Sequence, residues 1–155
     1  MNLPAVEDQL SIHDLYARYS WALDTGDTEA YARLFAAEAV VHETTPEGPR
    51  QIVGREQIRE FVLRFHLNPD FPGRQHRISQ IAISPDPEGR IDRWRVRSYV
   101  LTTETKDGYN PTVFWCGRGE DIVEKIDGEW LITSREIKPW GIDAFSPPDL
   151  DAARI

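Results

Sequence analysis

Cysteine is almost absent from this sequence, since Cys116 is the only one in 155 residues. A single cysteine cannot form a disulfide within the chain, nor can it supply the several thiolates of a zinc cluster. The first residues also lack the apolar core of a signal peptide. No run approaches the roughly 18 apolar residues that a membrane span requires. These absences favour a reducing compartment, and we expect a cytoplasmic location by default.

Basic residues are scarce relative to acidic ones. The chain has 18 Lys and Arg against 26 Asp and Glu, which gives a formal net charge of -8 and a sequence pI of about 5.0. An acidic surface repels phosphate backbones and anionic lipids, so neither nucleic acid nor a membrane is an expected partner. The basic residues between Arg90 and Arg97 alternate with apolar ones. That alternation is typical of the solvent-facing side of a strand.

Motifs for cofactors and metals are missing as well. The stretch Gly117-Arg118-Gly119 is too short for a phosphate-binding loop and lies inside a predicted strand. His13, His42 and His66 form no i,i+4 pair and no His-x-His spacing, so they predict no metal site. No serine or cysteine sits in a nucleophile elbow. We therefore expect neither a cofactor nor a metal.

Aromatic residues, in contrast, are plentiful. Five Trp, five Tyr and six Phe, in a chain that is 40% hydrophobic, can fill one core and line a pocket. A chain of this length usually forms one domain. We expect a single domain over residues 1–155, with a core at about 8–140 and a C-terminal arm at about 141–155. The apolar groups around Trp140, Ile142 and Phe145 predict that the arm docks over the pocket or onto another subunit, with a frayed end as the alternative.

Helical periodicity dominates the first half of the chain and strand patterns the second. Apolar residues at three- and four-residue steps predict helices over 6–23, 28–35 and 56–66. Gly26 can end the first helix in the left-handed conformation, and Asp27 can cap the second. Short strands are expected at 39–43 and 51–53, and longer ones at 76–84, 91–105, 112–126 and 129–138. Asp127-Gly128 predicts a tight hairpin between the last two. Consecutive long strands covered by amphipathic helices indicate an α+β fold.

Two stretches of sequence resemble a known family. The segment from Ile12 to Asp27, IHDLYARYSWALDTGD, followed by Leu34-Phe35, resembles the opening of the SnoaL-like group of the nuclear transport factor 2-like superfamily. The segments 119–123, 127–132 and 135–137 resemble its final hairpin. The resemblance implies a cone-shaped α+β barrel, in which a strongly curved mixed or antiparallel sheet and three N-terminal helices enclose a deep, mostly apolar pocket. It also implies a homo-oligomer, dimer or trimer, formed through the outer sheet face.

The group includes scytalone dehydratase, hexachlorocyclohexane dehydrochlorinase and bile acid 7-alpha-dehydratase. In its dehydratase-like members, an Asp at the end of the first helix orients a His from a strand beyond the third helix, and Asp24 and His76 match those places. A carboxylate behind an imidazole fixes its tautomer and stabilises its charged form, which makes a general base. From the residues alone, Asp24 could instead be a turn aspartate bonded to the backbone around Gly26, and His76 a structural histidine. Ile78, Gln80 and Ala82 are expected on the same strand face as His76.

Two further residues complete the expected site. Tyr19 matches a pocket tyrosine of the bile acid dehydratase and could donate a hydrogen bond to a developing oxyanion. Arg135 matches a family position from which a cation could bind a substrate carbonyl or leaving group. The alternatives are a core tyrosine with its hydroxyl at the surface and a solvated strand arginine.

The sequence thus predicts a cofactor-independent, dehydratase-like lyase or isomerase that acts on a small apolar carbonyl-bearing or cyclic substrate. The alternative is non-catalytic: a structural small subunit of a ring-hydroxylating dioxygenase, or a small-molecule-binding protein. Epoxide hydrolysis would need a carboxylate-activated water and a second acid, and the sequence identifies no such set.

Overall fold

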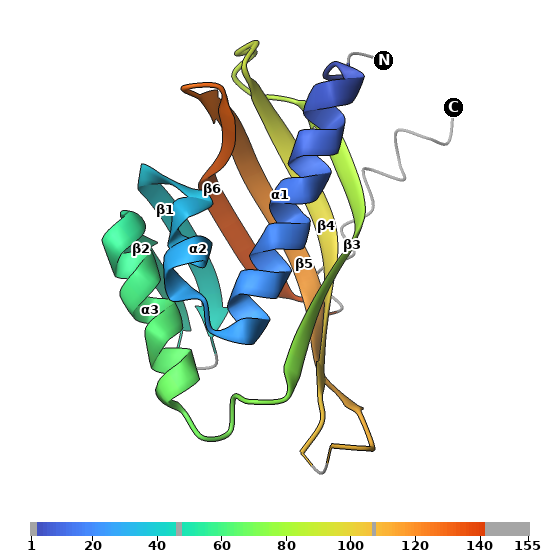
Figure 1. The fold of residues 1–155 in the computed structure, drawn as a ribbon. Coiled ribbons are helices and arrows are strands. Elements are labelled where there is room, and N and C mark those ends of the chain that lie inside the picture. Colours follow the sequence, from blue (N-terminus) through green and yellow to red (C-terminus); the bar gives the residue numbers. More distant parts are fainter. Residues whose placement is uncertain (1–2, 46–47, 107, 142–155) are drawn as a thin grey trace, which may run out of the picture.

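The computed structural model describes residues 3–45, 48–106 and 108–141 (Figure 1). Within these residues the chain forms three helices and six strands. The helices are α1 (Val6–Thr25), α2 (Thr28–Arg33) and α3 (Arg55–Leu67). The strands are β1 (Phe35–Thr45), β2 (Gly48–Val53), β3 (Arg74–Pro85), β4 (Arg93–Glu104), β5 (Thr112–Ile126) and β6 (Glu129–Pro139).

The apolar stripe predicted for the first helix is the buried face of α1, which ends as the sequence indicates. Gly26 takes a left-handed conformation with φ of 80°, and its N–H donates to the carbonyl oxygen of Ala22. One residue later, the carboxylate of Asp27 accepts a hydrogen bond of 2.9 Å from the N–H of Ala30 and so caps α2. Both expectations are confirmed. This compact turn fixes the end of α1, where Asp24 lies.

The six strands form one mixed sheet in the order β2-β1-β6-β5-β4-β3. The last four strands make the predicted antiparallel meander, and Asp127-Gly128 forms the tight turn between β5 and β6. Strand β1 joins β6 in parallel, which places β2 and β3 at the two edges. The helices all cover the same face of this curved sheet, with α1 crossing it diagonally and α2 and α3 lying near β1 and β2 (Figure 1). The predicted α+β class is confirmed.

The second helix is shorter than predicted. Residue Phe35 was expected to be its last residue, but α2 ends at Arg33 and Phe35 begins β1. Phe35 pairs with Ile132 of β6 and is fully buried there. A last helical turn and the first residue of a buried strand place an apolar side chain toward the core equally well, so periodicity alone could not separate them.

The strand face predicted beside His76 is only partly correct. Ile78 follows His76 toward the interior, but Gln80 and Ala82 are exposed, and Ile81 and Ile83 turn inward instead. The cause is an irregularity in the β3–β4 register between Ser79 and Ala82, where Gln80 has φ of 47°. An extra residue in one strand reverses the alternation beyond it.

The outer face of the sheet carries polar and exposed groups. Along β4, Arg97 and Tyr99 are exposed while Val96, Ser98 and Val100 are buried, as the predicted alternation requires. The indole of Trp140 packs against Tyr99 with ring centroids 5.0 Å apart. This residue therefore lies on the outer face and not over the interior, whereas residues 142–155 of the expected arm fall outside the described part of the chain.

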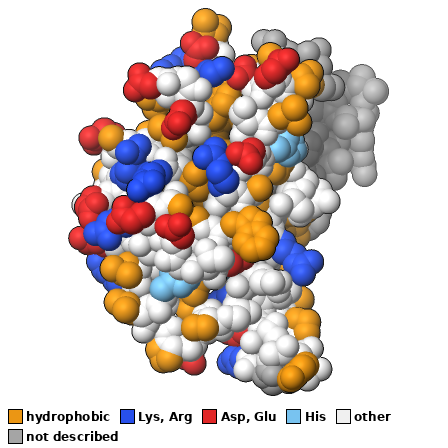
Figure 2. Space-filling model, in the orientation of Figure 1, with side chains coloured by type: hydrophobic (Ala, Val, Ile, Leu, Met, Phe, Trp, Pro, Cys, Tyr) orange, Lys and Arg blue, Asp and Glu red, His pale blue; other side chains and the backbone are white. Residues whose placement is uncertain are grey.

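The opposite, helical side is electrostatically mixed. Figure 2 shows Lys and Arg side chains interspersed with Asp and Glu across this face. Its ion pairs include Arg18–Asp14 at 2.8 Å and Arg59–Glu29 at 3.5 Å. In the described residues, no helix is both long enough and apolar enough to cross a lipid bilayer.

Candidate functional site

A cavity of about 210 Å³ lies between the concave face of the sheet and the three helices. Residues from all three helices and from every strand except β2 line it, so it is the common interior of the fold. Its walls are mostly apolar and aromatic, a composition typical of pockets for small organic molecules. The lining residues with polar groups are Tyr19, Tyr31, Glu43, Arg74, His76, Thr102, Trp115 and Arg135.

The structure brings Asp24 and His76 into direct contact. The imidazole Nδ1 of His76 lies 2.6 Å from Oδ1 of Asp24, and the backbone N–H of His76 donates to Oδ2 at 2.9 Å. The carboxylate therefore accepts two hydrogen bonds from one residue, which fixes both the strand and the ring relative to α1. Both side chains are 18% exposed. Asp24 is thus not the turn aspartate of the alternative interpretation, since its partner comes from β3.

The contact defines which imidazole nitrogen is available for chemistry. With Nδ1 held by Asp24, Nε2 is the remaining nitrogen of a ring that lines the cavity. The ring of Phe71 stacks against the imidazole at a centroid distance of 6.0 Å. A neutral imidazole with its Nδ1–H bonded to a carboxylate can accept a proton at Nε2, and the carboxylate then stabilises the imidazolium.

Tyr19 lies in the cavity wall with its hydroxyl in the interior. Only 4% of the residue is exposed, so the alternative with a surface hydroxyl is wrong. The hydroxyl of Tyr31 donates to the hydroxyl oxygen of Tyr19 at 2.9 Å. Because Tyr19 accepts this bond, its own proton is available to another acceptor. Burial, followed by the neighbouring Tyr19, raises the pKa of Tyr31 well above its ordinary value, so Tyr31 remains a neutral donor.

Arg135 is buried in the same wall and is not a solvated strand arginine. It is 1% exposed, and its Nη1 lies 2.9 Å from Oδ2 of Asp121. Its guanidinium carbon sits 4.2 Å from the ring centroid of Tyr19, a cation–π geometry. Burial acts to lower the pKa of Arg135, but the carboxylate of Asp121 outweighs it and the pKa is raised, so the group stays cationic.

Asp121 and Tyr16 support Arg135 from behind the cavity wall, and the sequence did not identify either residue. The hydroxyl of Tyr16 donates to Oδ2 of Asp121 at 2.6 Å, and both residues are fully enclosed. Burial raises the pKa of Asp121, an effect that Arg135 opposes. Gly119 leaves room for this cluster, because a Cβ there would lie 2.9 Å from the hydroxyl of Ser98 and 3.7 Å from Nη2 of Arg135. The cluster holds the guanidinium in one orientation.

Arg74 and Glu43 are two further ionisable residues in the wall, and no sequence motif indicated either of them. The guanidinium of Arg74 lies 3.8 Å from the ring centroid of Phe114 and pairs with Glu104 at 3.3 Å. Glu43 comes from β1, and burial raises the pKa of its carboxyl. His42, next to it, is exposed on the outer face. In the described part of the chain, no three His, Cys, Asp or Glu side chains are grouped to hold a metal ion.

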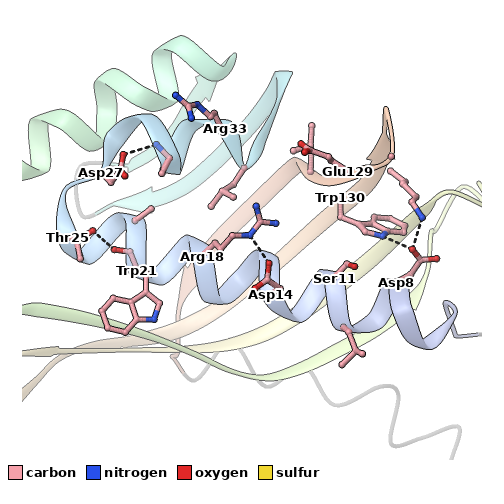
Figure 3. A pocket seen from close by; sticks show the side chains of 17 residues that line it. Asp8, Ser11, Asp14, Arg18, Trp21, Thr25, Asp27, Arg33, Glu129 and Trp130 are labelled. Carbon is pink, nitrogen blue, oxygen red and sulfur yellow. Dashed lines mark hydrogen bonds and ion pairs between the residues drawn. The ribbon is translucent and has the colours of Figure 1, made fainter.

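A larger groove of about 900 Å³ lies outside the core, between α1, α2 and the start of β6 (Figure 3). Several of its polar groups already bond to one another. Asp8 accepts hydrogen bonds from Lys125 and Trp130, at 2.8 and 2.9 Å, and Arg18 pairs with Asp14. None of the four predicted site residues lines this groove. The inner cavity, and not the groove, is therefore the candidate functional site.

Comparison with known proteins agrees with this architecture. A family model described as a SnoaL-like domain matches residues 4–136. A protein of unknown function with a cystatin-like fold from Nostoc punctiforme PCC 73102 is 26% identical, with a TM-score of 0.73, over 90% of this chain and 95% of that one.

Two similar structures come from Novosphingobium aromaticivorans. A proposed scytalone dehydratase is 25% identical, with a TM-score of 0.70, over 88% of this chain and 86% of that one. A proposed aromatic ring hydroxylase is 24% identical, with a TM-score of 0.73, over 90% and 93% of the two chains. With the curved sheet, the covering helices and the family match over most of its length, this chain belongs to the SnoaL-like family and has the cone-shaped fold of nuclear transport factor 2-like proteins.

Proposed function

We propose that this protein is a cofactor-independent lyase or isomerase that uses Asp24 and His76 as a general-base pair. The observation that carries the proposal is the 2.6 Å contact between them at the wall of an apolar cavity. The SnoaL-like family includes dehydratase, isomerase and cyclase enzymes as well as hydroxylase-associated proteins. General-base assistance of this kind typically contributes 10²–10⁴-fold to a rate.

In the proposed reaction, Nε2 of His76 removes a proton from a carbon beside a carbonyl group. The bonding electrons move onto the carbonyl oxygen, and Asp24 stabilises the imidazolium that forms. The enolate then expels a leaving group from the next carbon, or takes a proton at another carbon and so moves the double bond. Aromatic walls keep solvent away, which strengthens each of these electrostatic interactions.

Tyr19 and Arg135 are proposed to stabilise the developing oxyanion. The hydroxyl proton of Tyr19 is available because Tyr31 donates to its oxygen. The buried Nε–H of Arg135 has no hydrogen-bond partner among the described residues. Preorganised donors of this type are worth most where water is excluded, and removal of one typically costs 10²–10³-fold in kcat.

The charges around the cavity favour a neutral substrate. Arg135 is paired with Asp121, and Arg74 with Glu104, so neither cation requires an anionic ligand to balance it. The rings of Phe61, Phe65 and Phe71 form a continuous aromatic surface on one side. A small, largely apolar molecule with one carbonyl group meets both conditions.

A purely structural subunit or a ligand carrier would have no need for such a pair. Those roles require the fold and the cavity but not a carboxylate in contact with an imidazole. The short Asp24–His76 distance therefore favours catalysis over the non-catalytic alternative. Co-purification with a Rieske-type large subunit would favour the alternative instead.

The test uses 3-hydroxy-1-tetralone, a neutral bicyclic β-hydroxy ketone that becomes 1-naphthol by loss of water and tautomerisation. We expect the wild-type protein to accelerate naphthol formation, and His76→Ala and Asp24→Asn each to lower kcat by about 10²–10⁴-fold. His13→Ala, on the exposed side of α1, is the matched control and should retain full activity. Full activity in both site variants, on any substrate that the wild type converts, would show that the pair is not the base.

A further inference from the structure

Glu43 holds a position in the cavity that the proposed base pair does not use. Inward-facing residues alternate along β1 as Ala39, Val41 and Glu43, so the glutamate points toward the interior. Among the described residues it is the only Asp or Glu that lines the cavity. In the sheet order, β1 and β3 are separated by three strands, and the curvature of the sheet brings Glu43 and His76 to opposite walls of one space.

The surroundings of this carboxyl favour its protonated form. No hydrogen bond or ion pair to it is found among the described residues. Arg50 lies directly opposite on β2, but its guanidinium sits over the ring of Phe61, 5.6 Å from the centroid. A partly buried carboxyl without a donor loses solvation when it ionises and gains little in return. The same burial raises its pKa, against the smaller effect of Arg50.

We propose that Glu43 is the general acid that protonates the leaving oxygen when the substrate carries a hydroxyl group. This inference rests on the proposed function, in which His76 removes the proton from carbon. The C–O bond breaks, its electron pair takes the proton of the Glu43 carboxyl, and water leaves. The carbon–carbon double bond forms from the electrons of the broken C–H bond. His76 then gives its proton to solvent, and Glu43 regains one from solvent.

This arrangement separates the two proton transfers in space. A base and an acid in hydrogen-bond contact would exchange protons directly, whereas separate walls allow one group to face the C–H bond and the other to face the leaving oxygen. Tyr19 and Arg135 keep their proposed role as hydrogen-bond donors to the carbonyl oxygen. The three steps of an elimination therefore have three separate groups, one for the C–H bond, one for the carbonyl oxygen and one for the leaving oxygen.

A leaving-group comparison tests the acid role. Loss of water from 3-hydroxy-1-tetralone requires a proton on the leaving oxygen, whereas loss of acetate from 3-acetoxy-1-tetralone requires none. We expect Glu43→Gln to slow the first reaction at least about 10²-fold more than the second. His76→Ala should slow both by similar factors, because both begin with proton removal from carbon. Glu38→Gln, on the exposed side of the same strand, is the control.

The outcomes separate this inference from the proposed function. Equal effects of Glu43→Gln on both leaving groups would overturn the acid role while the base pair stands. Full activity of His76→Ala on both substrates would instead overturn the base pair.

A second measurement does not depend on turnover. Titration of the ¹³C-labelled glutamate carboxyls, with the Glu43 signal identified by its loss in Glu43→Gln, should show this group holding its proton to higher pH than a glutamate in an unstructured peptide. If the Glu43 carboxyl instead ionises over the same pH range as the peptide glutamate, the acid role is overturned, whichever substrate the enzyme converts.

Discussion

Arg135 carries its charge into the core only because Asp121 and Tyr16 accompany it. Its guanidinium and the Asp121 carboxylate are 1% and 0% exposed. Removing one partner of a buried pair leaves an uncompensated charge, which costs about 3–5 kcal/mol. We therefore expect Asp121→Asn to lower the free energy of unfolding by about that amount, measured by urea denaturation. It should also impair activity, because the cation loses its fixed orientation.

The control for this prediction is an exposed pair. Glu124 contacts Arg90, whose side chain is 51% exposed, so Glu124→Gln should cost less than about 1 kcal/mol. If the two substitutions lowered stability equally, the buried pair would contribute no more than a surface one.

Glu43 links the proposed chemistry to the pH dependence of stability. Burial raises the pKa of Glu43 in the folded protein. The contribution of such a carboxyl to stability is fully present below its unfolded pKa of about 4.3. That contribution is lost as the pH rises through the folded pKa. Relative to wild type, Glu43→Gln should therefore be more stable at about pH 7.5 than at about pH 4. Urea denaturation at both pH values measures the difference, and the same difference in Glu38→Gln would refute the assignment to Glu43.

How far the sequence could identify the site depended on the residue. Asp24, His76, Tyr19 and Arg135 line or support one cavity, and the family pattern had named them all. The pairing of Arg135 with Asp121 was not predictable, because an unbroken count from the Asp127-Gly128 turn would set Arg135 opposite Glu120. The register shifts between Ile122 and Val123, and only this irregularity brings Asp121 opposite Arg135.

The loop between α3 and β3 depends on one glycine. Gly73 has φ of 90°, and a Cβ at this position would lie 2.5 Å from the carbonyl oxygen of Thr105. The residue also accepts a hydrogen bond from the N–H of Thr105 at 3.0 Å, which ties the start of β3 to the end of β4. His76 follows three residues later, so this junction positions the imidazole.

We predict that Gly73→Ala destabilises the protein by more than Gly89→Ala, with a difference of at least about 1 kcal/mol. Both glycines have positive φ, and therefore both substitutions add backbone strain of about 1–2 kcal/mol. A Cβ at Gly89 has nothing within 4 Å, so only Gly73→Ala adds a clash with backbone. Thermal denaturation of the two variants measures the difference. Equal melting temperatures would mean that the loop adjusts freely around Thr105.

Elements were predictable where local signals agreed. The stripe of α1, the Gly26 turn and the Asp127-Gly128 hairpin each combine an apolar period with a residue suited to the turn. The start of β1 and the irregularity at Gln80 were not predictable, because each is set by how the strand pairs with another strand. Phe35 becomes a strand residue by pairing with Ile132, and no local signal near Phe35 indicates that partner.

At the scale of the whole molecule, the sequence indicated a curved sheet under helices but not how the sheet is joined. Its parallel pair, β1 with β6, connects the first and last strands of the described residues. This pairing brings Glu43 beside Ile137 and close to the strand that carries Arg135. The cavity therefore depends on a long-range contact, whereas the meander from β3 to β6 depends on sequential hairpins.

The outer face of this sheet bears on assembly. Tyr99 is 51% exposed on β4, Trp140 is 37% exposed, and their rings pack together. Arg97 lies two residues before Tyr99 on the same exposed side of β4. Arg95, a further two residues back, pairs with Glu120 of β5 at 2.6 Å, which offsets part of the local charge. Aromatic groups surrounded by arginine are typical of the centre of a protein–protein interface. We propose that two or three copies of this chain associate through this face.

The prediction is that Tyr99→Asp shifts the protein toward monomer, because two copies would bring the new carboxylates together at the centre of the contact. Sedimentation velocity at tens of micromolar protein measures the mass. Ile91→Asp is the matched control, since Ile91 is 86% exposed in the turn before β4 and lies away from that centre, and it should leave the mass unchanged. The cavity lies on the opposite side of the sheet, so naphthol formation should persist in both variants. A wild-type protein that sediments as a monomer would refute the assembly. If the Tyr99→Asp variant still sediments as an oligomer, the contact lies on another surface.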